Sequence, residues 1–193
     1  MAVGPRVVVL GALALAVAVA VAAGYYLAAG PSAEAGGGAR VYYVVPYEWS
    51  FAIFDEEWRR VDRIVVDRGE RLILVVLPRP FVPSELFESL EAEFAEYAVR
   101  EGLVSSREEL EELMEEVHHE EGIAGEVFGA EFVVHGLAIS GYEDEVNVAI
   151  DDGLVKVVEF VADEAGAFDI YCSAYCGWGH AYMRLAGGLV VNG

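Results

Sequence analysis

The chain has 193 residues and a formal net charge of -21 at pH 7, and Lys156 is the single lysine among its twelve basic residues. Such a composition offers no basic patch for nucleic acid or for an anionic lipid surface, so we expect neither as a partner. The length suits one folded domain of about 160 residues behind an N-terminal segment.

The N-terminal segment is apolar, because residues 7–29 contain no charged side chain. At a helical rise of ~1.5 Å per residue this stretch is long enough to cross a bilayer. A cleaved signal peptide is the alternative, but its apolar region is usually only about 7–15 residues long. We therefore predict a retained transmembrane anchor over residues 1–30 and a flexible, glycine-rich linker over residues 31–40.

The orientation of this anchor follows from charge. Arg6 precedes the apolar stretch, and the next basic residue is Arg40. The positive-inside rule then predicts a single-pass protein of the cell membrane with residues 41–193 on the extracytoplasmic side. Disulfides form readily in that compartment.

Short segments rich in Val, Ile and aromatic residues, separated by turn residues, dominate the domain. They predict strands at 41–45, 49–54, 63–66, 72–77, 131–139, 147–150, 154–161, 166–171 and 188–191. Many short strands with one helical interruption indicate a mainly β fold, a Greek-key β-sandwich or barrel.

The helical interruption is predicted at residues 82–128. Leu86, Leu90, Phe94 and Tyr97 recur at helical spacing, and a capping box at 106–109 begins a second helix. Residues 84–121 hold 14 Glu and 2 Arg, a net charge of -12. We expect an acidic helical hairpin inserted into the β domain. Two interpretations of the hairpin stay open: it docks a partner, or it is a solvated insertion.

Two histidines stand at 118–119. They are explained by the favourable interaction of a histidine with the helix dipole at a C-terminus.

Both cysteines of the chain stand within five positions, in the pattern C-x3-C-x3-H-x2-M formed by Cys172, Cys176, His180 and Met183. Thiolate, imidazole and thioether are soft ligands, which copper prefers, whereas zinc has little use for a methionine. A single-copper site needs two histidines and one cysteine, so a second histidine would come from elsewhere, and His135 in an apolar strand is the candidate. A disulfide between the two cysteines is the competing interpretation.

The stretch Cys172-Ser-Ala-Tyr-Cys-Gly-Trp-Gly-His-Ala-Tyr-Met183, together with the upstream Val134-His-Gly136, resembles subunit II of cytochrome c oxidase. The resemblance is to the short form, in which one membrane helix precedes a cupredoxin domain. It covers the anchor and residues 41–80 and 130–193, but not the acidic hairpin. It implies a cupredoxin-like fold and a dinuclear copper A centre of two copper ions. The implied ligands are the bridging sulfurs of Cys172 and Cys176, the imidazoles of His135 and His180, and two weak ligands, Met183 and the backbone carbonyl of Ala174.

The resemblance implies a function in electron transfer. The chain would be the electron-entry subunit of a haem-copper terminal oxidase, an oxidoreductase complex, and would pass electrons from cytochrome c or another donor to the catalytic subunit I that reduces oxygen. Trp49 matches the family's electron-entry aromatic, although an aromatic residue packed in a strand is an equal alternative. Trp178 would shield the metal or face the membrane-embedded subunit.

The sequence departs from the family's pattern at one position of the loop and in the helical insertion. Ala174 stands where the family usually has Glu or Gln, so this loop is expected to offer no side-chain ligand for magnesium. The acidic hairpin lies outside the family-like strands, so we expect its removal to spare copper binding. Two alternative functions remain. The chain could be a cupredoxin for copper delivery or storage, or a copper A protein of another reductase such as nitrous oxide reductase.

Overall fold

The computed structural model describes residues 38–114, 135–150 and 154–193. Four predicted features lie wholly or partly outside the described residues: the anchor at 1–30, positions 31–37 of the linker, positions 115–128 of the helical insertion with its histidine pair at 118–119, and positions 131–134 of the strand predicted at 131–139. Within those described ranges, no helix combines the length and the apolar character that a membrane crossing requires.

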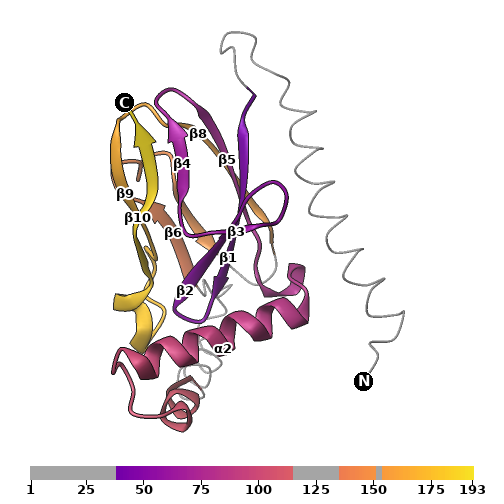
Figure 1. Ribbon diagram of the computed structural model, residues 1–193, viewed down its shortest axis with the longest axis vertical. Helices are drawn as coiled ribbons and strands as arrows, with labels where there is room; N and C mark the ends of the chain where they lie inside the picture. Colours follow the sequence, from indigo (N-terminus) through magenta and orange to yellow (C-terminus); the bar gives the residue numbers. More distant parts are fainter. Residues whose placement is uncertain (1–37, 115–134, 151–153) are drawn as a thin grey trace, which may run out of the picture.

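The described residues form two five-stranded mixed sheets, as the sequence predicted for a mainly β fold (Figure 1). The first sheet has the order β3-β2-β1-β5-β8, with β3 at Arg60–Val61, β2 at Ser50–Phe54, β1 at Arg40–Tyr47, β5 at Arg71–Val76 and β8 at Lys156–Val161. The second has the order β4-β10-β9-β6-β7, with β4 at Ile64–Asp67, β10 at Arg184–Asn192, β9 at Gly166–Tyr171, β6 at His135–Ile139 and β7 at Asn147–Ile150. Each sheet contains one parallel pair, β1 with β5 and β10 with β4.

The core lies between the sheets and draws on both. In the first sheet β1 and β5 are central, which explains their near-continuous apolar runs; Val44, Val45 and Leu74 are fully buried. Leu137, Ile170 and Leu189 of the second sheet belong to the same hydrophobic cluster. Burying a side chain of this kind stabilises the fold by about 1.5–3 kcal/mol.

Most strands begin within one or two residues of the predicted position, and the starts of β10 and β2 are the differences that affect the site. β10 begins at Arg184, earlier than the predicted 188, because the strand continues through a register shift between Leu185 and Leu189 in which Gly187 has a φ of 60°. β2 begins at Ser50, so Trp49 lies in the turn after β1 rather than in the predicted strand. Residue Glu48 of this turn has a positive φ of 40°. The short strand β3 was not predicted.

The predicted first helix is present as α2 (Ser84–Arg100), which crosses one end of the two sheets (Figure 1). It ends next to Gly102, whose φ of 70° is unfavourable for other residues. A short 3-10 helix, η1 (Arg79–Phe81), precedes it. A second helix occupies residues 107–114 and extends to the limit of the described range. At its start, Ser106 Oγ accepts a hydrogen bond from Glu109 N at 3.2 Å, which is one of the two bonds of a capping box. The Glu109 carboxylate accepts from the amide of Ser105, at 2.7 Å, and not from that of Ser106.

The buried face of α2 packs into the core of the domain. Five of its residues are buried: Phe87, Leu90, Phe94, Ala95 and Ala98. They belong to the same hydrophobic cluster as the residues of the two sheets. The observed buried face differs from the predicted one at its two ends. Phe87 is buried although it was not predicted, and Tyr97, which was predicted, is 43% exposed. This helix forms part of the domain core, a packing that the charge count of the hairpin did not indicate.

Candidate metal centre

Strand pairing brings the predicted ligands to one end of the second sheet. His135 is the first residue of β6, and β6 pairs with β9 through Ala138 opposite Tyr171. Cys172 directly follows β9, and Met183 directly precedes β10. The loop between these strands, residues 172–183, is called the copper loop below. The short helix η2 (Trp178–Tyr182) carries His180, and the Cys172 amide donates to the Met183 carbonyl at 3.0 Å, closing the loop.

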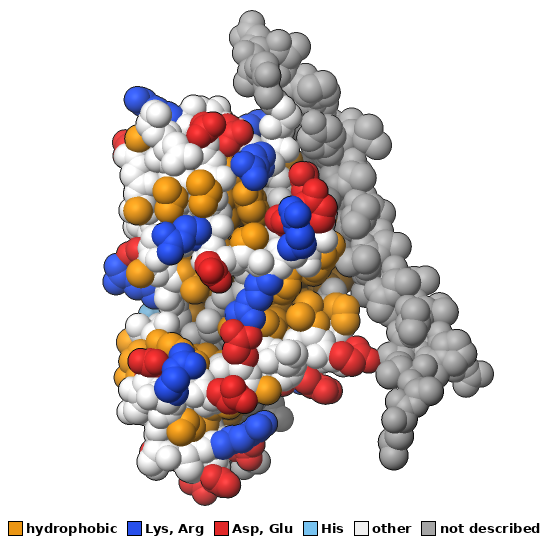
Figure 2. Space-filling model, in the orientation of Figure 1, with side chains coloured by type: hydrophobic (Ala, Val, Ile, Leu, Met, Phe, Trp, Pro, Cys, Tyr) orange, Lys and Arg blue, Asp and Glu red, His pale blue; other side chains and the backbone are white. Residues whose placement is uncertain are grey.

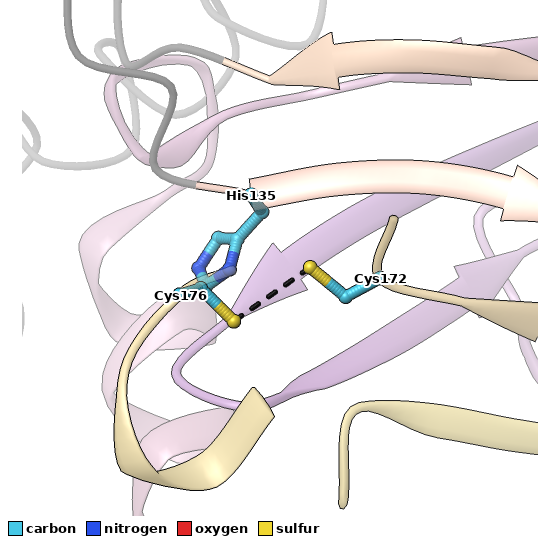
Figure 3. Close-up of side chains that lie close together, drawn as sticks. All are labelled: His135, Cys172 and Cys176. Carbon is cyan, nitrogen blue, oxygen red and sulfur yellow. Dashed lines mark hydrogen bonds between the residues drawn. The ribbon is translucent and has the colours of Figure 1, made fainter. Parts of the chain in front are cut away.

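The soft donor atoms lie close together. The Sγ atoms of Cys172 and Cys176 are 3.6 Å apart, and Cys176 Sγ is 3.6 Å from His180 Nδ1 and 3.9 Å from Met183 Sδ. The ring of His135 points at the two sulfurs from β6 (Figure 3), and the ligand atoms of these three residues lie within 4.8 Å of one another. The carbonyl oxygen of Ala174 is 3.0 Å from Cys172 Sγ. All six residues predicted from the sequence are thus grouped around one sulfur pair.

The two cysteines are not joined by a disulfide in this structure. A disulfide requires an S–S distance of about 2.05 Å, well below the 3.6 Å observed between the Sγ atoms. The cysteines are also enclosed, because Cys172 is 5% exposed and Cys176 is 4% exposed.

The imidazole of His135 supplies the test of whether a metal fits this site. Its Nδ1 atom is buried and has no hydrogen-bond partner among the described residues. A buried polar nitrogen without a partner carries a cost of about 1–3 kcal/mol, which coordination of a metal ion removes. A ring nitrogen of His135 lies within 4.8 Å of both thiol sulfurs. A second imidazole and a thioether lie beside the sulfur of Cys176, and this donor set suits copper. The residues present therefore fit a copper site.

The surroundings of Cys172 favour its thiolate form. The contact with Cys176 lowers the pKa of Cys172 most, and the nearby His135 side chain and the Gly136 amide act in the same direction, while burial opposes them. The result is a pKa of about 3, compared with an ordinary value near 9. The Gly136 amide donates to Cys172 Sγ at 3.3 Å. Because a thiolate is the form that binds metals, this environment prepares the site for a cation.

Glycine at 136 is required by the close approach of the copper loop. A Cβ atom at this position would overlap Ser173 Oγ and would lie 2.8 Å from the Ala174 backbone nitrogen. Ser173 Oγ also donates to Asn147 Oδ1 at 2.8 Å, which fastens the loop to β7. The Val-His-Gly motif therefore contributes both a ligand and the space for the loop.

Trp49 is a residue beside the site whose position the sequence did not indicate. Electron entry and packing within a strand were equal interpretations of this residue, and its side chain is only 3% exposed. Its indole Nε1 donates to the carbonyl oxygen of Cys176 at 2.8 Å, and its ring stands 5.3 Å from that of Trp178 in an edge-on arrangement. No local sequence pattern indicates that residue 49 lies beside residue 176. The two residues meet because the β1–β2 turn packs against the copper loop.

An open pocket of about 410 Å³ gives access to the site. Cys172, His180 and Met183 line it on the metal side. Its outer wall includes the ion pair in which Arg184 Nε donates to Asp169 Oδ2 at 2.9 Å, and a hydrogen bond from the Tyr171 hydroxyl to Glu143 at 3.3 Å. The three sulfur residues are therefore buried, the two histidines are half-buried, and the site can be reached from one side.

No protein-family model matches the sequence, and no curated protein matches it. Among solved structures, the chain is similar to the periplasmic domain of subunit II of cytochrome oxidase from Bradyrhizobium japonicum, with 13% identity, coverage of 80% of this chain and 86% of that chain, and a TM-score of 0.44. It is also similar to a chain of a heme-copper terminal oxidase dimer, with 15% identity, coverage of 94% of each chain and a TM-score of 0.42. A third similar structure is an oxidized amicyanin variant, with 14% identity, coverage of 83% and 88%, and a TM-score of 0.29.

Proposed function

We propose that this chain is the electron-entry subunit of a haem-copper terminal oxidase. Residues 41–193 would form a cupredoxin-like domain on the extracytoplasmic side of the cell membrane, held by an anchor at residues 1–30. The domain would accept electrons from cytochrome c or another donor and pass them to the catalytic subunit I, where oxygen is reduced. This chain would transfer electrons and would not itself catalyse the reduction of oxygen.

The observation that carries the proposal is the arrangement of the donors around the sulfur pair. Two thiols 3.6 Å apart, a second imidazole, a thioether and a buried imidazole nitrogen that has no partner in the described part of the chain are gathered in one place. A disulfide would leave His180 and Met183 without a reason for their positions. A single copper ion would leave one thiol beside the metal without a role.

The residues of the site would hold two copper ions, which supply a one-electron acceptor shared through sulfur bridges. Cys172 and Cys176 would bridge the ions, His135 and His180 would each hold one, and Met183 and the Ala174 carbonyl would be weak ligands. The fold contributes rigidity, since Met183 is 1% exposed and the loop is tied to β7 and to the β1–β2 turn. A rigid, enclosed ligand set keeps the rearrangement on electron transfer small.

The aromatic residues beside the copper loop suggest how electrons enter. A donor does not reach Trp49 directly, because this side chain is 3% exposed. Tyr182 is 45% exposed, its ring lies 5.5 Å from that of Trp178, and Trp178 lies 5.3 Å from Trp49. Electrons would then pass from Tyr182 to Trp178 and on to Trp49. Trp49 would be the last aromatic residue before the site, joined to Cys176 by the 2.8 Å hydrogen bond.

Burial of the sulfur ligands supports electron transfer over copper delivery or storage. A delivery protein must release its metal to a partner, whereas Cys172, Cys176 and Met183 are at most 5% exposed. We therefore expect copper to leave slowly when a strong chelator is added. Rapid loss would favour delivery or storage.

The decisive experiment is a metal count combined with electron spin resonance on the full chain loaded with copper. We expect two copper ions per chain and one unpaired electron split by both nuclei. Cys176→Ser should abolish this signal because one shared sulfur is lost. Tyr175→Phe is the matched control, since Tyr175 lies in the same loop, is 81% exposed and should leave the signal unchanged. Retention of the two-copper signal in Cys176→Ser would contradict the proposal.

A further inference from the structure

We infer that Trp49 is a positioning residue for the copper loop, fixing Cys176 and η2 through one hydrogen bond and one steric contact. The inference rests on the proposed copper site and gives Trp49 a role there that exists even when no electron donor is present. It differs from a relay role, which would affect only the rate of electron transfer.

The hydrogen bond joins two distant parts of the chain inside the protein. Trp49 Nε1 donates to the Cys176 carbonyl at 2.8 Å, across a sequence separation of 127 residues, and the bond is buried. A buried carbonyl that loses its donor keeps the cost of desolvation without a compensating bond. The Cys176 backbone is therefore strongly favoured in its present position while Trp49 is in place.

The steric contact involves Gly179, the residue before the proposed ligand His180. A Cβ atom on Gly179 would overlap the indole ring of Trp49. The φ of Gly179 lies outside the left-handed region, so the backbone conformation at this position does not itself demand glycine. Glycine is needed here because the indole occupies the space of a side chain.

The indole of Trp49 is itself restricted by packing, so it can fix the position of the copper loop. Phe94 of α2 packs against it with ring centroids 6.1 Å apart, and Trp178 packs on it at 5.3 Å. With only 3% of the side chain exposed, the indole has little room to move. The position of the Cys176 backbone in turn sets its sulfur relative to His180 Nδ1 and Met183 Sδ, at 3.6 and 3.9 Å.

The first test separates the indole N–H group from the bulk of the ring. Trp49→Phe in the full chain keeps an aromatic ring and removes the donor. Trp58→Phe is the matched control, because Trp58 Nε1 is also buried but has no hydrogen-bond partner among the described residues. We expect Trp49→Phe to release copper to a chelator about two- to tenfold faster, the range that one buried hydrogen bond corresponds to, and to alter the copper hyperfine splitting. Trp58→Phe should change neither.

The second test addresses the steric contact. Gly179→Ala should speed copper release in the otherwise unchanged chain, because the new methyl group displaces either the indole or η2. In a Trp49→Ala background the overlap disappears, so adding Gly179→Ala should cause a smaller further change. If Gly179→Ala has the same effect in both backgrounds, Trp49 does not fix η2.

A third measurement needs no copper. In the reduced, metal-free chain, the amides of His180 and Met183 are hydrogen-bonded within the loop, at 3.2 Å each. We expect their hydrogen exchange to be faster in Trp49→Phe than in Trp58→Phe. Equal exchange, together with unaltered copper release, would overturn the inference. If the unaltered chain bound no copper pair, the proposed function would fail, and the exchange rates would still decide the role of Trp49.

Discussion

Phe94 of α2 provides the sharpest test of whether the helix belongs to the core or is a removable insertion. Its side chain is 4% exposed and packs edge-on against Trp49 at 6.1 Å. Truncation of a buried phenylalanine to alanine typically costs about 3–5 kcal/mol of unfolding free energy. Phe94 also lines a cleft of about 300 Å³, which lets water reach the vacated space. We therefore expect Phe94→Ala to cost about 3 kcal/mol, at the lower end of that range.

Denaturant unfolding of the full chain, followed by tryptophan fluorescence, measures this change. The chain has three tryptophans, Trp49, Trp58 and Trp178, and all three lie in the described part of the domain. Tyr97→Ala is the matched control, because Tyr97 lies one turn further along α2 and is 43% exposed. We expect the control to cost less than about 1 kcal/mol.

Equal effects of Phe94→Ala and Tyr97→Ala would refute the reasoning and show that α2 is not part of the core. The sequence alone led us to expect that removal of residues 82–128 would spare copper binding. With five residues of α2 buried in the common cluster, we now expect that deletion to destabilise the domain and to loosen Trp49.

Two further predictions concern the copper site and its donor. Met183→Leu should keep two copper ions but raise the reduction potential, because a weak donor to the oxidised state is lost; a redox titration measures this, and loss of copper would make Met183 an essential ligand. Reduction by a basic donor should slow steeply as salt rises, because the screening length falls to ~8 Å at physiological ionic strength. Residues 84–114 carry ten Glu against two Arg, and Figure 2 shows acidic side chains, with arginines among them, at the end of the molecule where α2 lies. Stopped-flow kinetics at several salt concentrations measure this rate, and a salt-independent rate would indicate an apolar docking face.

Local chemistry made much of the strand pattern predictable from the sequence. Apolar runs such as those of β1 and β5 gave strands within one or two residues of their observed bounds, since central strands must be buried on both faces. The start of β10 was missed because a glycine pair reads as a break, whereas here Gly187 and Gly188 accommodate a bulge inside one strand. An apolar face of α2 was predicted, and Leu90 and Phe94 are buried as expected, but its packing into the core of the two sheets was not indicated because glutamates dominate the composition of this segment.

The candidate ligands were determined by the sequence itself. Cys172, Cys176, His180 and Met183 stand at fixed spacing in one loop, so their proximity follows from short chain connections. His135 was named as the candidate second histidine because a single-copper site needs two, and its place beside the sulfurs depends on the pairing of β6 with β9.

Only the tertiary structure decided what supports these ligands. Trp49 reaches Cys176 because the β1–β2 turn, α2 and the copper loop meet at one end of the two sheets, and no local pattern records a contact across 127 residues. The requirement for glycine at 136 and 179 has the same origin. Each leaves space for a group from a distant segment, the Ser173–Ala174 backbone at one position and the Trp49 indole at the other, and such space exists only once the chain has folded.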